Sequence, residues 1–199
     1  MIAIFDYGAG NLQSVQNALA EIGCEYALVN DAGGLRRATK ILLPGVGHFG
    51  QMIRAIDALG VRETLCARLA SGAPFLGICL GMQAIFEGSE EAPEARGLGL
   101  LAGTVKRFPP ESRVPHMGWN ELEVRNESVL LRGLPDRPFV YFAHSYYVPD
   151  RPDAAACCAY GVRYTAALEI GNLYGVQFHP EKSGSLGLRI LKNFLSLEC

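Results

Sequence analysis

The chain has 199 residues, of which 49% are hydrophobic and 19% charged, and a formal net charge of −2. These values exclude a disordered chain and indicate a single globular domain over residues 1–199. The near-neutral balance, without a basic cluster, argues against a nucleic-acid partner. No apolar run approaches the ~18 residues of a membrane span, and the N-terminus lacks the basic region of a signal peptide, so we expect a cytoplasmic protein.

Cysteine usage points to the same compartment. The six cysteines lie mostly in apolar stretches, and none forms a C-x-x-C or other metal-ligand spacing. Such a pattern is typical of reduced thiols in the cytoplasm. We therefore expect no disulfide framework, no metal and no cofactor.

The first ninety residues alternate between two kinds of apolar pattern. Short apolar runs predict strands, and apolar residues at helical spacing predict helices between them. The strands are expected at residues 2–5, 26–29, 40–43 and 74–78, and the helices at 12–22, around 35–37, and in one long region over 52–69. This alternation predicts βαβ units and a parallel sheet covered on both faces. The loops at 6–11, 44–50 and 79–83 then leave the carboxyl ends of strands, where ligands bind in such folds.

The pattern changes after residue 88. Alternating stretches at 99–108 and 121–125, interrupted by prolines, predict a more antiparallel section. Buried strands are expected at 139–142 and 173–178, and an amphipathic helix over 186–197. Together the two halves predict an α/β fold of three αβα layers, with a mostly parallel central sheet and an antiparallel β section.

Residues 77–81, Gly-Ile-Cys-Leu-Gly, follow an apolar strand and precede a predicted helix. This is the nucleophile-elbow pattern with Cys79 in the place of the usual serine. The flanking glycines allow neighbouring backbone to approach a tight turn, and a helix N-terminus directed at the sulfur favours the thiolate. A buried cysteine is nevertheless more often inert packing. A nucleophile also requires a base within reach.

His179 is the best candidate for that base. It follows an apolar strand, and Glu181 stands two positions on, which puts both side chains on one side of an extended chain. Pro180 favours extension at His179. The three residues then have the roles of nucleophile (Cys79), general base and acid (His179) and orienting carboxylate (Glu181). His116 and His144 have no carboxylate placed in this way, and we interpret them as structural or interface residues.

At this point the motifs resemble a known family. Gly-Ile-Cys-Leu-Gly-Met-Gln at 77–83 and Gln-Phe-His-Pro-Glu at 177–181 are similar to the motifs of class I, triad-type glutamine amidotransferases, which have a nucleophile-elbow fold. Segments 6–12, 44–47, 115–120, 141–146 and 182–184 resemble the glutaminase subunits of imidazole glycerol phosphate synthase, so that the likeness runs nearly from end to end.

That resemblance implies glutamine hydrolysis through a glutamyl thioester on Cys79. It also implies a partner, a (β/α)₈-barrel cyclase subunit that receives the ammonia in histidine biosynthesis. The cyclase would make imidazole glycerol phosphate and an aminoimidazole carboxamide ribotide.

Acyl transfer needs donors directed at the tetrahedral oxyanion. The N–H of Leu80, directly after the nucleophile, is one by elbow geometry. The resemblance implies that Val46 supplies the second. Gly45 and Gly47 flank Val46, permit unusual dihedral angles and are expected to contact the substrate. We hypothesise that this peptide turns its N–H into the site when the partner is loaded.

Further contacts with glutamine are expected from two segments. Gln83 lies one helical turn after Cys79, so both share a face of the predicted helix. A solvated glutamine on a helix surface is the alternative. Ser145 and Tyr146 resemble the segment whose backbone holds the substrate amino acid. A packed aromatic at the end of a strand is an equal alternative for Tyr146.

The interface with the cyclase is expected to include Asn11, Trp119 and Lys182. An exposed tryptophan is a favoured anchor at interfaces. For Trp119 a buried position is a nearly equal alternative. These three positions follow from the resemblance alone.

Other functions stay open from the sequence. Residues 45–50 match G-x-G-x-x-G, but the acidic residue that dinucleotide binding requires further on is missing. The nearest alternative is the glutaminase subunit of another amidotransferase, such as that of pyridoxal phosphate synthase. A stand-alone γ-glutamyl cysteine hydrolase and a catalytically inactive paralogue are the others.

Overall fold

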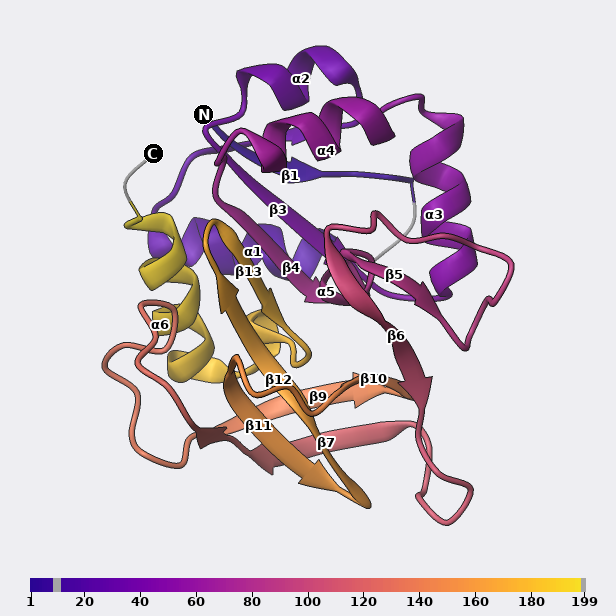
Figure 1. Ribbon diagram of the computed structural model, residues 1–199. Helices are drawn as coiled ribbons and strands as arrows, with labels where there is room; N and C mark the ends of the chain where they lie inside the picture. Colours follow the sequence, from indigo (N-terminus) through magenta and orange to yellow (C-terminus); the bar gives the residue numbers. More distant parts are fainter. Residues whose placement is uncertain (9–11, 198–199) are drawn as a thin grey trace.

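The computed structural model describes residues 1–8 and 12–197. Parallel strands form one half of the large sheet, in the order β2-β1-β3-β4-β13 (Figure 1). These strands and the helices that connect them are β1 (Ile2–Phe5), α1 (Leu12–Ile22), β2 (Tyr26–Val29), α2 (Ala32–Arg37), β3 (Lys40–Gly45), α3 (Phe49–Ala58), α4 (Arg62–Ala70), β4 (Phe75–Cys79), α5 (Leu80–Gln83), β13 (Leu173–Val176), the 3₁₀ turn η1 (Pro180–Lys182) and α6 (Gly184–Leu195). Within the described ranges, no helix has the length and apolar character needed to cross a membrane.

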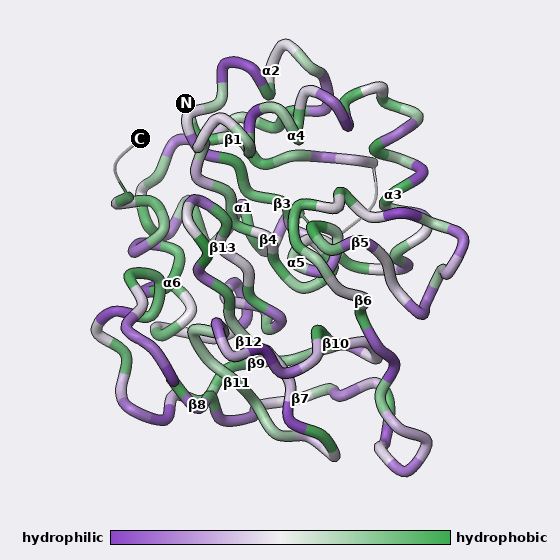
Figure 2. The backbone as a smooth tube through the Cα atoms, viewed as in Figure 1, coloured by the Kyte–Doolittle hydropathy of each residue, from purple (hydrophilic) through white to green (hydrophobic). Residues whose placement is uncertain are grey.

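Helices cover both faces of this sheet. Successive residues of a strand point to opposite faces, so Ile41 and Leu43 join one core cluster and Leu42 joins the other. Buried side chains of α2, α3 and α4 pack in the first cluster, and those of α1 and α6 pack in the second. Figure 2 shows the hydrophobic colour running along β3 in the middle of the molecule. The three-layer αβα arrangement is confirmed.

The other half of the sheet is mainly antiparallel. It continues from β13 through β12 (Val162–Ile170) and β10 (Tyr146–Pro149) to β6 (Leu101–Arg107) and β5 (Phe86–Ser89). β11 (Ala154–Tyr160) pairs with β12 and with the short β8 (Glu123–Val124). β7 (His116–Glu121) and β9 (Phe139–His144) form a separate antiparallel pair. The predicted antiparallel section is therefore confirmed.

Two helical predictions need correction. The long helical region at 52–69 is two helices, because the chain turns at Gly60, where φ is +65°. The helix after Cys79 has four residues and is followed by a turn and by β5, so its apolar run at 84–86 leads into a strand instead. A single turn of helix supplies a few free N–H groups but little macrodipole, which weakens the expected contribution of this helix to the thiolate.

Candidate active site

The elbow is a sterically forced turn. Cys79 has φ of 53° and ψ of −108°, and no other non-glycine residue in the described ranges has a positive φ. A side chain in that region is strained and persists only when its surroundings hold it. A Cβ on Gly77 would lie 2.6 Å from the Gly81 carbonyl, and one on Gly81 would lie 1.8 Å from the carbonyl oxygen of Leu43. The two glycines are therefore required by the close packing of β3, β4 and α5.

The loops after β1, β3 and β4 meet at one edge of the sheet, as predicted. The register of β3 and β4 pairs Gly45 with Cys79. The Tyr7 hydroxyl donates a hydrogen bond of 3.2 Å to the carbonyl oxygen of Val46. Burial raises the pKa of Tyr7 to about 12, so its phenol stays a neutral donor. Gly47 has φ of 98°, which a glycine adopts without strain.

His179 and Glu181 form a buried pair. The two atoms His179 Nδ1 and Glu181 Oε1 are 2.7 Å apart, and the side chains are 3% and 5% exposed. Burial lowers the pKa of His179, but the charge and hydrogen bond of Cys79, together with those of Glu181, outweigh it and raise the pKa to about 10. The arrangement therefore favours a protonated imidazole beside the Cys79 sulfur.

The local geometry of this pair differs from the expected one. Glu181 belongs to η1, so a 3₁₀ turn and not an extended segment brings its carboxylate back to His179. The backbone N–H of His179 donates to the Tyr141 carbonyl at 2.8 Å. Ser183 Oγ donates to the His179 carbonyl at 2.7 Å and accepts from the Tyr141 N–H at 3.0 Å. Sequence reasoning missed Ser183, whose role depends on β9 lying beside the turn.

A cavity of about 290 Å³ opens in front of the sulfur, at the lower end of the usual range for ligand pockets. Its lining brings together most of the expected residues, namely Val46, Gly47, Cys79, Leu80, Gln83, Ser145, Tyr146, His179 and Lys182. Gly45 lies behind it, where a Cβ would come within 2.8 Å of the Leu80 Cβ. The structure thus places Gly45 against the elbow and not in this cavity.

Two side chains of the lining are Gln83, for which the sequence leaves an alternative open, and Glu91, for which the sequence predicts no role. Gln83 is 3% exposed, so the alternative of a solvated glutamine is wrong. Its Nε2 donates to the Tyr146 carbonyl at 2.9 Å and to Gln177 Oε1 at 3.0 Å. Glu91 also lines the cavity, and its Oε2 accepts from the Phe49 N–H at 2.7 Å. No sequence signal marks Glu91, because it stands in a segment that reads as a polar surface loop.

Of the expected interface residues, Lys182 lines the cavity and Trp119 is linked to it through Tyr141. Trp119 is 56% exposed on β7, so its buried alternative is wrong, and Met117 and Phe139 are also exposed. The rings of Trp119 and Tyr141 meet edge to face with centroids 6.2 Å apart, and Lys182 Nζ lies 5.8 Å from the centre of the Tyr141 ring. Asn11 lies outside the described residues.

His116 and His144 are buried in a polar cluster with Tyr164. His116 Nδ1 lies 3.3 Å from His144 Nε2, and the Tyr164 hydroxyl lies 3.2 Å and 3.3 Å from those two atoms. Burial lowers the pKa of His116 to about 4 and that of His144 to about 3, so both rings are neutral. Their structural interpretation agrees with these contacts. The described part of the chain contains no group of three or more His, Cys, Asp or Glu side chains placed to hold a metal ion.

Comparisons with known proteins agree on the family. Residues 3–197 match the model of the class-I glutamine amidotransferases. The chain is 48% identical to imidazole glycerol phosphate synthase subunit HisH of Methanothermobacter thermautotrophicus, over 99% of this chain and 98% of that one. It is 47% identical to the same subunit of Deinococcus radiodurans, over 97% and 92% of the two chains.

Solved structures support the fold. A crystal structure of a glutamine amidotransferase superposes with a TM-score of 0.77 at 20% identity, covering 98% of this chain and 96% of that one. A chain of PurLQS from Thermotoga maritima gives 0.74 at 20% identity, covering 98% and 96%. The elbow, the buried histidine–glutamate pair and these likenesses all agree. The chain belongs to the class-I glutamine amidotransferases, and within them to the HisH subunits of imidazole glycerol phosphate synthase.

Proposed function

We propose that this enzyme hydrolyses glutamine through a thioester on Cys79 and delivers the ammonia to a (β/α)₈-barrel cyclase subunit. The observation that carries the proposal is the strained elbow cysteine in contact with the buried His179–Glu181 pair, at the wall of a cavity of about 290 Å³. The names of the relatives support imidazole glycerol phosphate synthase as the assembly. The reduced-thiol composition supports a cytoplasmic site of action.

The first half of the reaction makes the thioester. The Cys79 thiolate attacks the side-chain amide carbon of glutamine, and the carbonyl oxygen gains the negative charge. The N–H groups of Leu80 and Val46 are the proposed donors to that oxygen. His179 gives its proton to the leaving nitrogen, which departs as ammonia. Glu181 holds the imidazole through Nδ1, so that Nε2 is the nitrogen available for this transfer.

The second half releases glutamate. Neutral His179 takes a proton from a water molecule, and the resulting hydroxide attacks the thioester carbon. The carbon–sulfur bond breaks, the Cys79 thiolate leaves, and His179 is again protonated. The high pKa of His179 supports the return to this charged pair.

Substrate binding is proposed for the cavity lining. Gly45 and Gly47 shape the oxyanion loop, and the backbone at Ser145 and Tyr146 holds the amino-acid end of glutamine. Both hydrogens of Gln83 Nε2 are engaged within the protein, which leaves its Oε1 as an acceptor. Glu91 is an acidic side chain of the lining and offers a carboxylate for the α-ammonium group.

The proposed partner binds the face that carries Trp119 and Lys182, together with Asn11. The exposed apolar side chains of β7 and β9 support this assignment, because Met117 lines the cavity and Trp119 is exposed two residues further along the same strand. The Val46 peptide is proposed to complete the oxyanion hole when the cyclase is loaded. The cyclase would then form imidazole glycerol phosphate and an aminoimidazole carboxamide ribotide.

The test is glutaminase activity of the isolated chain, of the chain with the cyclase, and of the complex with the cyclase's nucleotide substrate. We expect a strong rise in the full mixture. Equal activity in all three would contradict the gating of the oxyanion loop and leave a stand-alone hydrolase. If the cyclase neither binds the chain nor raises its glutaminase activity, and another acceptor subunit does both, the chain belongs to a different amidotransferase.

A further inference from the structure

A glutamine that the proposed mechanism does not use touches the nucleophile. Gln177 follows β13, is fully buried, and its Nε2 lies 3.6 Å from Cys79 Sγ. Hydrogen bonds to sulfur are longer than those to oxygen, because the sulfur atom is larger. The amide therefore stands within donor range of the reacting atom.

The orientation of this amide is determined by a carbonyl oxygen. The Tyr146 carbonyl only accepts, so the atom of Gln83 that lies 2.9 Å from it must be the amide nitrogen. The second hydrogen of that nitrogen points at Gln177, 3.0 Å away, and needs an acceptor there. Gln177 Oε1 must occupy that position. Its Nε2 is thereby turned toward the sulfur of Cys79.

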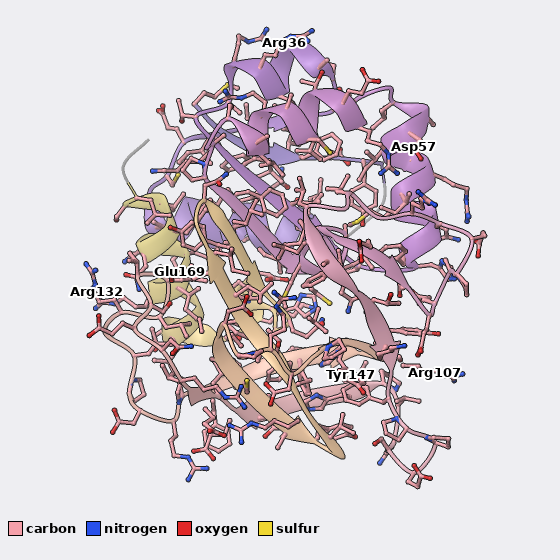
Figure 3. The ribbon with its side chains drawn as sticks, viewed as in Figure 1. Arg36, Asp57, Arg107, Arg132, Tyr147 and Glu169 are labelled. Atoms are coloured by element: carbon pink, nitrogen blue, oxygen red, sulfur yellow. The ribbon has the colours of Figure 1, made fainter. Side chains whose placement is uncertain are left out.

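The carbonyl that sets this orientation is itself held on a second side. His144 Nδ1 donates to the Tyr146 oxygen at 2.8 Å, and the other nitrogen of that ring faces Tyr164 and His116. Tyr146 also pairs with Arg107 through β10 and β6. Figure 3 shows Arg107 and the neighbouring Tyr147 on these two strands. A chain of hydrogen bonds thus links the Tyr146 carbonyl through the buried amides of Gln83 and Gln177 to the thiol.

We propose that Gln177 is a positioning residue for the nucleophile, whose side-chain amide donates to the Cys79 thiolate and holds the sulfur in line with His179 and the cavity. A hydrogen bond to a charged acceptor is stronger than one to a neutral acceptor, so the amide favours the thiolate over the thiol and over the thioester. It acts together with the imidazolium of His179 from a different element of the fold. Its function is needed here because α5 is a single turn and supplies little helix dipole.

The test measures alkylation of Cys79 by iodoacetamide in the full-length chain across a range of pH, quantified at that residue by peptide mass spectrometry. Gln177→Met keeps the volume and removes the donor. We expect the pH profile of its alkylation to move upward by about one unit, so that the rate falls about tenfold on the acidic limb, where little of the thiol is ionised. Gln177→Glu keeps the acceptor for Gln83 but puts an oxygen against the sulfur, so it should react more slowly still.

The matched control is Thr165→Val, on the neighbouring β12. Thr165 is also fully buried, and its hydroxyl donates to the Pro149 carbonyl at 2.8 Å, away from the thiol. Loss of that bond should reduce stability and leave the alkylation profile of Cys79 unchanged. If the folded Gln177 variants also show the wild-type profile, Gln177 only fills space and the proposal is overturned.

A second measurement needs no substitution at Gln177. In nuclear magnetic resonance spectra, its side-chain amide protons should shift when Cys79→Ala removes the sulfur. The amide of Asn172, which donates to the Leu69 and Ala73 carbonyls at 2.8 Å each, should stay in place. An unshifted Gln177 amide contradicts the hydrogen bond.

The importance of Gln177 for catalysis rests on the proposed function, but the thiol measurement does not. If Gln177→Met has an altered alkylation profile but the wild-type complex does not hydrolyse glutamine, the proposed function is refuted and the positioning role stands. If Gln177→Met has the wild-type alkylation profile and normal glutaminase activity, the positioning role is refuted and the proposed function stands. In a double-mutant cycle, Gln83→Met should add little to Gln177→Met for alkylation, because the two amides act as one unit.

Discussion

Glu181 Oε1 lies 2.7 Å from His179 Nδ1, and both side chains are almost completely buried. In Glu181→Gln the negative charge is lost while the size is kept. We expect glutaminase activity to fall about 100-fold or more, because the imidazole loses the group that holds its tautomer and stabilises its charge. The pKa of His179, followed by nuclear magnetic resonance, should fall as well, since one of the two partners that raise it is gone. Glu63→Gln, an exposed change on α4, is the control and should leave both quantities unchanged.

A second prediction separates the two partners of His179. Cys79→Ser removes the thiolate, because a serine hydroxyl stays neutral at physiological pH. A nearby negative charge favours the protonated imidazole, so its loss must lower the pKa of His179 from about 10. Glutaminase activity should disappear in the same variant. A His179 pKa that is unchanged in Cys79→Ser would show that no thiolate is present in the wild-type resting state.

Much of the fold, and the elbow at Cys79, follows from the local sequence. Strands β1 and β2 were predicted because short apolar runs alternate with helical spacing, and the elbow because its glycines flank a cysteine at a strand end. The sequence does not predict β11, since its first five residues, Ala-Ala-Ala-Cys-Cys, are buried on both faces and show neither alternation nor strong β propensity. Helical spacing also continues past Gly60, so the sequence alone predicts one helix where the structure has two.

The missed site residues have a common reason. Gln177, Ser183 and Glu91 act on groups from other elements, and their neighbours are set by the sheet order β4-β13 and by β9 lying beside η1. Such contacts are non-local, so the spacing of residues along the chain does not encode them. The position of Trp119 is open from the sequence for the same reason, because the strand pattern alone does not show which face of the β7–β9 pair packs on the rest of the protein.

The packing of the elbow predicts a large effect of one methyl group. In Gly81→Ala the Cβ would lie 1.8 Å from the Leu43 carbonyl oxygen, which is backbone and has no room to move. We expect the free energy of unfolding to drop by about 3 kcal/mol or more, measured by denaturant titration. Gly88→Ala is the matched control, since the nearest atom to its Cβ would be the Ala95 carbonyl oxygen at 3.9 Å. Equal stability of the two variants would contradict the close approach of β3 and α5.

Trp119 tests the proposed interface. Its side chain is more than half exposed, so Trp119→Ala should change the free energy of unfolding by no more than about 0.5 kcal/mol. If it is an anchor of the cyclase interface, the dissociation constant of the complex should rise about 30-fold or more, as measured by titration calorimetry. Leu59→Ala, another exposed apolar residue at the end of α3, should leave binding unchanged. Unaltered affinity in Trp119→Ala would place the partner on another surface.

The buried histidines predict acid sensitivity. The folded-state pKa of His116 is about 4, below the ordinary value of 6.5, so the unfolded chain binds a proton that the folded chain excludes. Stability must therefore fall as pH drops from 6.5 toward 4, by up to about 1.4 kcal/mol per pH unit for this group. In His116→Asn the side chain is neutral at every pH, so this part of the slope should vanish even though overall stability is lower. The hydrogen bond from Arg125 lowers the pKa of Asp150, so protonation of such carboxylates also reduces stability in acid. This contribution is the same in wild type and variant. The readout is thus the difference in slope between wild type and variant in denaturant titrations at successive pH values, and parallel curves would show that His116 is already charged in the folded protein.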